Sequence, residues 1–322
     1  MAGLEVVPFS DEHLDAAAEL LAARHARHRA AEPLLSPHYE AVAGAREELE
    51  RVWRFDGASG AAGFRDGRLS GYIVGAPRTH PAWGANVFVE AAGHAIERPE
   101  EARDLYAVTA ARWVEEGRPR HSVVVPAHDS ELLDAWWRLC FGQQQAHGIR
   151  EVPEGIDVRV PDGFEIRQPR EEEVEHLIDV DLALPEHQVA SPVFGGHGVP
   201  AREESREEWL KTFAGEEEAI LIGARDGRPV ACWAWVPAEL SGEHRGIVRP
   251  DRAMHLGFAA TLPEARGSGI GVALTEAGFA LAAELGYATM ITDWRVTNLL
   301  ASRFWPRRGF RTSFLRLYRS IP

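Results

Sequence analysis

The chain has 322 residues, of which 45% are hydrophobic and 26% charged, and its formal net charge is −14. This composition is typical of a globular protein with room for two domains, and the acidic charge argues against general binding to nucleic acid or to an acidic membrane, which needs a basic surface. No apolar run is long enough to span a bilayer, and no basic segment followed by an apolar one opens the chain, so we expect neither a membrane partner nor a signal peptide.

Cysteine usage indicates the expected compartment. The two cysteines, Cys140 and Cys232, lie in apolar runs far apart in the chain. We therefore expect buried, reduced thiols, with no disulfide and no metal between them. The predicted location is the cytoplasm.

Hydrophobic periodicity and turn residues predict alternating strands and helices in the first half of the chain. The predicted elements are strand 4–9, helix 11–28 capped by Ser10, helix 43–51, strands 61–64 and 70–76, strand 85–91, helix 99–116, strand 121–125 and helix 130–139. Asp66-Gly67, between the paired strands, is a strong hairpin signal. Trp136 and Trp137, on the last of these helices, are expected to pack between domains.

The pattern then begins again, which indicates an internal repeat. The tetrapeptide Arg-Asp-Gly-Arg occurs at 65–68 and again at 225–228, 160 positions later. Asp129 matches Asn298 at the larger offset of 169. We infer that the second copy carries extra residues between its hairpin and its last helix, where a glycine-rich loop lies.

The second copy is predicted to follow the same order of elements. Its elements are strand 164–166, helix 171–184, the hairpin around 225–228, strand 254–260, helix 272–285, strand 288–294 and a short helix after Asn298. The segment 151–163 is rich in proline, glycine and acids, as domain linkers are. We therefore predict two domains, 1–157 and 158–322.

Residues 265–271, Ala-Arg-Gly-Ser-Gly-Ile-Gly, join strand 254–260 to helix 272–285. Glycines let backbone N–H groups approach a ligand closely. The first N–H groups of a helix lack intrahelical partners and carry the positive end of its dipole, so this loop predicts a phosphate site. The dinucleotide fingerprint does not fit, because Val272 and Leu274 stand where a third glycine is needed, and the loop has no lysine, which a nucleoside-triphosphate loop requires.

The Arg-x-x-Gly-x-Gly spacing at 266–271 resembles the coenzyme A pyrophosphate loop of the GNAT superfamily of N-acetyltransferases. Asn-x-x-Ala at 298–301 and Gly-Phe at 309–310 follow in the order usual for that family. The resemblance implies an α/β (α+β) fold of two tandem GNAT-like domains, each a mixed twisted sheet flanked by helices. In the first copy the segment 93–101 has one glycine and three acids, which would repel pyrophosphate. Only the C-terminal copy is therefore expected to bind acetyl-CoA.

The resemblance also implies which residues contact the cofactor. Backbone groups at the end of the fourth strand would hold the thioester carbonyl and the pantetheine arm, with Leu262 and Pro263 on the approach to the loop. The expected cofactor-binding residues are Phe258, Ala259, Ala260, Thr261, Arg266, Gly267, Ser268, Gly269, Ile270, Gly271, Asn298, Ala301 and Trp305. Helix capping alone would also explain Asn298. The arginines expected around the phosphates, or else as ordinary surface, are Arg252, Arg266, Arg303, Arg307 and Arg308.

By the same resemblance, His255 stands at the position of the general base. A histidine has an unperturbed pKa of about 6.5, which suits proton uptake near neutrality. A histidine hydrogen-bonded within the core is an equal alternative. Asp293 and Glu239 are further candidates for the base, and His187 and His197 fall in a predicted loop as solvated side chains or as part of the acceptor site.

The family usually has a tyrosine that protonates the leaving thiolate, four residues after the alanine of Asn-x-x-Ala. Here that position is Trp305, and an indole cannot serve as an acid. Water, Tyr287 or Tyr318 could take that role, or the thiolate could leave unprotonated. A domain that binds acyl-CoA without turnover is also consistent with Trp305.

Two further patterns have structural alternatives. Trp233 and Trp235 alternate on a predicted strand and so share one face, either in the core or at the acceptor pocket. His25 and His28 lie one helical turn apart, but no third ligand is apparent, so we expect no metal.

The leading hypothesis is an acyl-CoA-dependent N-acetyltransferase. It would move an acetyl group from acetyl-CoA to an amine of a small molecule by direct transfer in the C-terminal domain. A non-catalytic acyl-CoA-binding or sensing protein is the alternative, and a purely structural tandem module is a third. The acidic charge favours a cationic small-molecule amine as partner, and both a monomer and a homodimer are compatible with two fused sheets.

Overall fold

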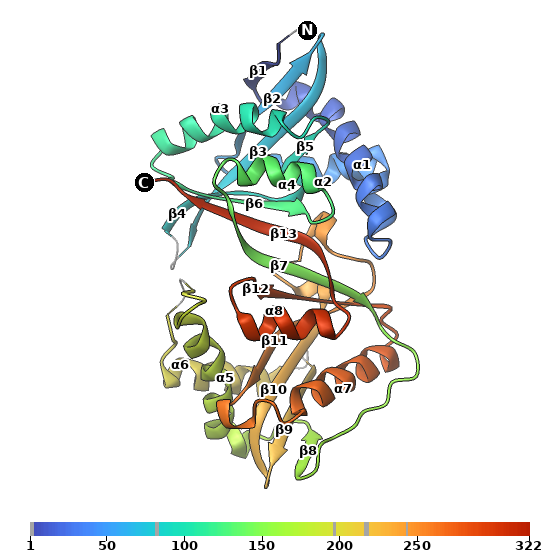
Figure 1. Cartoon of the computed structure of the whole chain (residues 1–322), viewed down its shortest axis with the longest axis vertical. Coiled ribbons are helices and arrows are strands. Elements are labelled where there is room, and N and C mark those ends of the chain that lie inside the picture. The colour runs from blue at the N-terminus through green and yellow to red at the C-terminus, as the bar shows by residue number, and fades with distance from the viewer. Residues whose placement is uncertain (1–2, 81–83, 196–197, 216–218, 243) are drawn as a thin grey trace. The chain divides into compact units, whose positions relative to one another are not determined.

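The computed structural model describes residues 3–322, apart from 81–83, 196–197, 216–218 and 243 (Figure 1). Its contacts divide the chain into two compact units. Unit 1 comprises Met1–His147, Arg245–Pro250 and Thr312–Pro322, and unit 2 comprises Gly148–His244 and Asp251–Arg311. The units are therefore not consecutive halves of the chain, and the repeat boundary at 157/158 stays a prediction.

Unit 1 is a mixed sheet with helices on it. Its elements are β1 (Glu5–Pro8), α1 (Leu14–Ala31), α2 (Val42–Trp53), β2 (Ser59–Arg65), β3 (Arg68–His80), β4 (Gly84–Val89), β5 (His94–Ile96), α3 (Glu101–Glu115), β6 (Arg120–Pro126), α4 (Ser130–Trp137) and β13 (Arg311–Ser320). The strand order is β1-β2-β3-β4-β6-β13, with β5 beside β3. Strands β4 and β6 run parallel, and β13 pairs with β6 in the antiparallel sense.

Unit 2 repeats this plan. Its elements are β8 (Phe164–Arg167), α5 (Val174–Val189), α6 (Arg202–Ala214), β9 (Ala219–Arg225), β10 (Arg228–Pro237), β11 (Ala253–Thr261), α7 (Ile270–Glu284), β12 (Thr289–Arg295) and α8 (Leu299–Arg307). The strand order is β8-β9-β10-β11-β12, and only β11 and β12 run parallel. The fold is thus the mixed α/β arrangement of two similar sheets that the sequence predicts. No helix among the described residues combines the length and apolar character needed to cross a bilayer.

Strand β7 (Gly142–Glu151) was not predicted, and the unit boundary falls within it, between His147 and Gly148. Its sequence, Gly-Gln-Gln-Gln-Ala-His-Gly-Ile-Arg-Glu, shows no apolar alternation. The strand is nevertheless largely buried, and its Gln145 side chain accepts a hydrogen bond from Arg316. Polar partners of this kind replace the apolar face that normally reveals a strand in a sequence.

The two Asp-Gly turns confirm the predicted hairpins. Asp66 and Gly67 have φ values of 49° and 76°, and Asp226 and Gly227 have 51° and 78°. Two consecutive residues with positive φ match the two-residue turn whose twist fits an antiparallel pair, and Asp-Gly tolerates this conformation best. The two copies therefore share a turn as well as a sequence.

The register of the strands shows where the second copy is longer. Ala76 pairs with Phe88 in unit 1, whereas Val236, its counterpart at an offset of 160, pairs with His255. The connection between these strands is therefore longer in unit 2, and segment 238–252 supplies the extra residues. In addition, eight residues separate β11 from α7, but only four separate β5 from α3. Both stretches lie between the hairpin at 225–228 and the last helix, α8, where the sequence predicts the extra residues.

Helix α7 packs closely on β10 because it carries glycines where the tryptophans lie. A Cβ atom at Gly278 would fall 2.2 Å from Cζ2 of Trp235, and one at Gly271 would fall 3.3 Å from Cη2 of Trp233. Both tryptophans are buried. Of the two alternatives for Trp233 and Trp235, the structure therefore confirms core packing.

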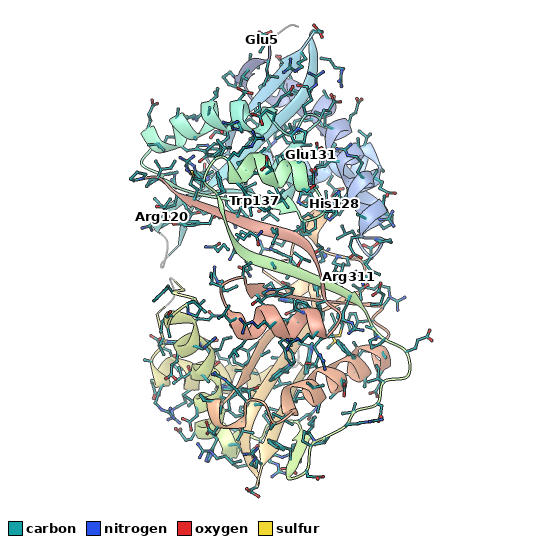
Figure 2. All side chains as sticks on the ribbon, in the orientation of Figure 1. Glu5, Arg120, His128, Glu131, Trp137 and Arg311 are labelled. Carbon is teal, nitrogen blue, oxygen red and sulfur yellow. The ribbon has the colours of Figure 1, made fainter. Side chains whose placement is uncertain are left out.

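Two smaller expectations were wrong, and one helix was missed. Trp136 is fully buried inside unit 1, where its ring meets Tyr106 and Phe141 edge to face, while Trp137 is exposed (Figure 2). Cys140 is exposed rather than buried. Helix α6 was not predicted, because its sequence is dominated by charged residues.

Candidate functional site

The parallel strands β11 and β12 part midway along their length. They pair from Ala253 to Leu256 on β11, and the hydroxyl of Thr292 on β12 donates to the Leu256 carbonyl oxygen over 3.1 Å at the end of the paired stretch. Beyond that point β11 keeps its pairing with β10 as far as Thr261. Among the described residues, 257–261 on β11 thus have an edge that β12 does not cover, and backbone groups on such an edge can bind an extended ligand.

Residues 262–269 form the loop between β11 and α7. Gly267 and Gly269 have φ values of 77° and 92°, a region that suits glycine. The Ser268 hydroxyl donates to the Ala265 carbonyl oxygen over 2.7 Å, which closes the turn. No hydrogen bond within the described chain engages the N–H groups of Gly267 and Gly269. These groups and the first turn of α7 form a concave set of donors suited to an anion.

The charges around this loop also favour an anion. The first turn of α7 contains no acid, and Arg266 is exposed, with its Nε donating to the Thr261 carbonyl oxygen over 3.2 Å. Arg252, by contrast, donates to the carbonyl oxygen of Gly286, beyond the other end of α7. A helix of 15 residues is about 22 Å long. The expectation that Arg252 lies near the phosphate site was therefore wrong.

Asn298 caps α8, as predicted. Its Oδ1 accepts from the backbone N–H groups of Leu300 and Ala301 over 3.1 and 3.2 Å. The same oxygen lies 3.1 Å from Nε2 of His187, which is in the last turn of α5. His187 is therefore not a solvated loop side chain, and this expectation was wrong.

Trp305 lies in the core of unit 2. Its ring packs against Phe304 and Phe310 at centroid distances of 4.8 and 5.7 Å, and 6% of the residue is exposed. The side chain at the position of the expected acid thus fills space next to α8. Ala301, one turn earlier in the helix, is half-buried.

His255 lies on β11, just before the strands part. Its Nε2 is 3.6 Å from Oδ1 of Asp293 on β12, and its ring centroid is 4.7 Å from that of His244. Gly257, two residues further on, has no side chain, and a Cβ atom there would fall 3.7 Å from Nδ1 of His255. The structure therefore places His255 and Asp293 together at the branch point, with one side of the imidazole next to a glycine.

Sequence reasoning missed His244. This residue lies in segment 238–252, between β10 and β11. Its backbone N–H donates to Oγ of Ser241 over 3.2 Å, and its Nδ1 lies 3.4 Å from the same oxygen. No pattern in the sequence places it near His255, because the two are brought together by a connection without regular spacing.

The other candidates lie elsewhere. Glu239 is exposed in a 3-10 turn after β10, and Tyr287 precedes β12 at the end opposite to the branch point. Tyr318 is on β13, which belongs to unit 1. His197 lies outside the described residues.

The loop of unit 1 that corresponds to residues 262–269 contains acids, and other side chains of unit 1 bind them. Glu97 binds Arg68 through two hydrogen bonds of 2.7 and 2.5 Å, and the buried Glu101 accepts from Ser70 and Arg65. Two acids, Glu101 and Asp104, lie in the first turn of α3. Carboxylates thus take the positive end of this helix, where an anionic ligand would otherwise bind.

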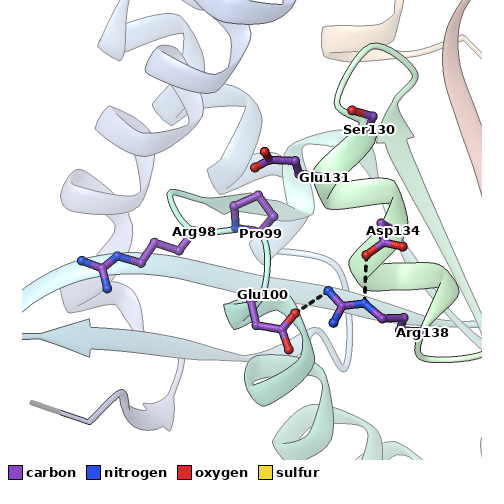
Figure 3. A pocket seen from close by; sticks show the side chains of 7 residues that line it. All are labelled: Arg98, Pro99, Glu100, Ser130, Glu131, Asp134 and Arg138. Atoms are coloured by element: carbon purple, nitrogen blue, oxygen red, sulfur yellow. Dashed lines mark hydrogen bonds and ion pairs between the residues drawn. The ribbon is translucent and has the colours of Figure 1, made fainter. Parts of the chain in front are cut away.

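A shallow pocket of about 450 Å³ lies beside this loop, between the starts of α3 and α4 (Figure 3). Arg138 crosses it and binds Glu100 and Asp134 at 2.5 and 2.9 Å. Arg138, one of the two arginines that line the pocket, is therefore already paired with carboxylates of the same unit.

Comparisons with known proteins agree with this geometry. Residues 185–310 match the model of the acetyltransferase (GNAT) family. The structure of a GCN5-related N-acetyltransferase from Sphaerobacter thermophilus has a TM-score of 0.61 at 13% identity, and the match covers 98% of this chain and 95% of that one. The glucosamine N-acetyltransferase region of a fungal multi-domain GH3 beta-N-acetylglucosaminidase has a TM-score of 0.56 at 14% identity, over 99% of this chain and 38% of that chain. A comparison with curated protein sequences gives no match.

The fold and the loop thus define a class of tandem α/β acyltransferase-like proteins. The C-terminal half of the chain belongs to the acetyltransferase (GNAT) family, whose members use acyl-CoA.

Proposed function

We propose that the chain is an N-acetyltransferase whose unit 2 transfers an acetyl group directly from acetyl-CoA to an amine of a small molecule. The observation that carries this proposal is the combination, in unit 2 alone, of an uncovered strand edge with a glycine loop that leads into a helix, α7, whose first turn contains no acid. Unit 1 has a branch point of its own, but its helix begins with acids.

Each part of acetyl-CoA has a suitable partner in unit 2. Residues 266–271 would bind the pyrophosphate through backbone N–H groups, the helix end and the Arg266 side chain. Backbone groups of 258–261 would pair with the amides of the pantetheine arm, as an added strand does. An N–H group at the same edge would polarise the thioester carbonyl as negative charge develops on its oxygen.

The reaction joins the amine nitrogen to the acetyl carbon and breaks the bond between that carbon and sulfur. An ammonium group must first lose a proton, because an alkylamine has a pKa of about 10.4. We propose that Nδ1 of His255, which lies next to Gly257, accepts this proton, while Oδ1 of Asp293 lies 3.6 Å from Nε2, close enough to hold that nitrogen after a small side-chain movement. Asp293 would thereby fix the tautomer that leaves Nδ1 as the acceptor.

The departing thiolate has no tyrosine beside it in this proposal. The indole of Trp305 is buried against Phe304 and Phe310, and Tyr287 lies at the far end of β12. The thiolate would therefore leave as such and take its proton from water. Asn298 and Ala301 would contact the cofactor only through the start of α8.

We further propose that the acceptor is a cationic small molecule, since the net charge of −14 favours cations over phosphorylated compounds. Polyamines and aminoglycosides fit this charge. An amino sugar joins the panel because the fungal relative carries a glucosamine N-acetyltransferase region. A cytoplasmic location and a monomer or homodimer complete the proposal.

Trp305 supports a second candidate function, a non-catalytic acyl-CoA-binding or sensing protein. A protein that does not turn over acetyl-CoA needs no acid for a leaving thiolate, so the buried indole of Trp305 fits this function. The same protein would bind acetyl-CoA with the same residues but would release no thiol.

One assay separates the two functions. Purified protein with a metal chelator, acetyl-CoA and spermidine, kanamycin, glucosamine or lysine is monitored for free thiol and for N-acetylated product. We expect turnover with at least one amine, and His255→Gln should lower kcat by at least about a hundredfold without weakening acetyl-CoA binding. His176→Gln, an exposed histidine on α5, is the matched control. Binding without turnover would favour the sensor, and failure to bind acetyl-CoA would contradict both.

A further inference from the structure

Three side chains with metal-binding atoms meet at the branch point of unit 2. His244, His255 and Asp293 each offer one ligand atom, and these atoms lie within 4.8 Å of one another. In the part of the chain that the structure describes, this is the single group of three or more His, Cys, Asp or Glu residues so arranged. It is separate from the pair His25 and His28, where no third ligand is apparent in the sequence and no metal is expected.

The cluster is buried and polar. His244 and His255 are 1% and 6% exposed, and 22% of the Asp293 side chain is exposed. Neither ring nitrogen of His255 has a hydrogen-bond partner among the described residues. A buried polar atom without a hydrogen bond is costly, and a metal ion would supply the missing partner.

The local structure directs these atoms to one point. His255 pairs with Ile291, and Asp293 follows two residues later on β12, just past the paired stretch, so that Nε2 and Oδ1 are 3.6 Å apart. The connection 238–252 brings His244 alongside, and Ser241 contacts Nδ1 of that ring at 3.4 Å. A metal-binding histidine typically has its second nitrogen held in this way, which leaves the first as the ligand.

Unit 1 lacks all three groups. The residue that corresponds to His255 in the strand register is Phe88. Asp293 corresponds to Val124 at the offset of 169 that relates β12 to β6. His244 has no counterpart, because the connection that carries it is the one that is longer in unit 2. The cluster thus arises from the same copy that carries the glycine loop.

We propose that His244, His255 and Asp293 bind one divalent transition-metal ion, with zinc the preferred ion. Two imidazoles and one carboxylate suit zinc, cobalt and nickel, whereas magnesium and calcium favour oxygen ligands. Tetrahedral ligands at about 2.0–2.1 Å from zinc lie roughly 3.3 Å apart, so the present spacing closes by small side-chain rotations. The exposed side of Asp293 leaves the fourth position open to water.

A functional consequence follows, and it rests on the proposed acetyltransferase activity. The metal would fix the ring of His255 and compete with proton uptake from the amine. Zinc would then inhibit acetyl transfer and leave acetyl-CoA binding unchanged, because the glycine loop is a separate part of unit 2.

The test is metal binding by the full chain without any substrate. Chelator-treated protein is titrated with cobalt, read by its visible absorption, and with zinc in competition with a chromophoric chelator. We expect one ion per chain, a tetrahedral cobalt spectrum, and binding at least about a hundredfold weaker in His244→Ala and Asp293→Asn. His176→Ala, which changes an exposed histidine, should bind as the wild type does.

Variants that fail to fold would not decide the question, so the wild type is also examined by X-ray absorption at the zinc edge. Two imidazole nitrogens in the zinc shell support the site, and a shell with one or none overturns it. Absence of binding, or binding that neither variant alters, would also overturn it. Because these readouts need no turnover, they remain informative if the acetyltransferase proposal fails.

Discussion

The start of α3 in unit 1 and the start of α7 in unit 2 are the same place in two copies of one fold, and they differ in charge. In unit 1, Glu97, Glu100 and Glu101 are bound by arginines and a serine of that unit. In unit 2, the loop has an exposed arginine and no acid at the helix start. The helix end that is proposed to bind an anion in unit 2 thus has carboxylates of the chain itself beside it in unit 1.

The largest expected effect is the response of unit 1 to acid. Burial lowers the pKa of His25 to about 4, of His94 to about 3 and of His28 to about 2, all in unit 1. The unfolded chain has the ordinary value of about 6.5, so it binds more protons than the folded chain below that pH. The stability is complete above pH 6.5 and falls as the pH drops towards 4, by about 2 kcal/mol for each histidine at pH 5.

Hydrogen exchange at pH 7 and pH 5, corrected for intrinsic rates, would measure this effect on peptides of α1. We expect amide exchange in α1 to accelerate strongly at pH 5. In His28→Gln, the loss of stability between pH 7 and pH 5 should be smaller by the contribution of one histidine, about 2 kcal/mol. Equal protection of α1 at both pH values would contradict the prediction.

The second prediction concerns the acids of unit 1. Glu101→Gln leaves Arg65 and Ser70 without the carboxylate that both contact, and we expect a loss of about 3 kcal/mol, as for other broken buried pairs. Asp104→Asn, in the same helical turn but exposed, should cost less than about 1 kcal/mol. Urea unfolding measures both, and a neutral Glu101→Gln would show that this carboxylate does not hold the loop.

The third prediction transfers the acid of one copy to the other. Gly269 corresponds to Glu100 at the offset of 169. Gly269→Glu and Gly269→Ala share the strain of a side chain at φ 92° and the contact with Pro161, but only the glutamate adds a charge at the anion site. We expect at least about a hundredfold weaker acetyl-CoA binding for Glu than for Ala. Calorimetry should also show one site in the wild type, and two sites would mean that unit 1 binds the cofactor.

The smallest effect concerns packing. Gly278 of α7 corresponds to Thr109 of α3, whose side chain unit 1 accommodates. In unit 2 a Cβ atom would meet the indole of Trp235 at 2.2 Å, so Gly278→Ala should cost about 2 kcal/mol by overpacking. The double variant Gly278→Ala/Trp235→Phe should recover part of that loss in thermal unfolding. If the losses from the two single changes simply add in the double variant, the overpacking does not arise between these two side chains.

Features that depend on a few consecutive residues were predictable. The Asp-Gly turns, the cap at Asn298 and the conformations of Gly267 and Gly269 follow from local backbone preferences. Strand β7 was not predictable in this way, since its burial depends on partners such as Arg316, 171 residues away. The glycine loop, where acetyl-CoA is proposed to bind, is therefore recognisable in the sequence. The beginning of unit 2, which lies within β7, is not.

Tertiary structure alone shows what surrounds His255 next to the loop. The sequence leaves open whether His255 is a core residue or a base, and the proposal that it is the base depends on Asp293 at 3.6 Å; His244 approaches through a connection of no fixed spacing. Likewise, the acids of unit 1 were visible as charges, but the arginine partners of Glu97 and Glu101 come from a hairpin about 30 residues earlier. Local sequence determines φ, caps and turns because these involve neighbouring atoms, while contacts between distant side chains exist only once the sheet has brought its strands together.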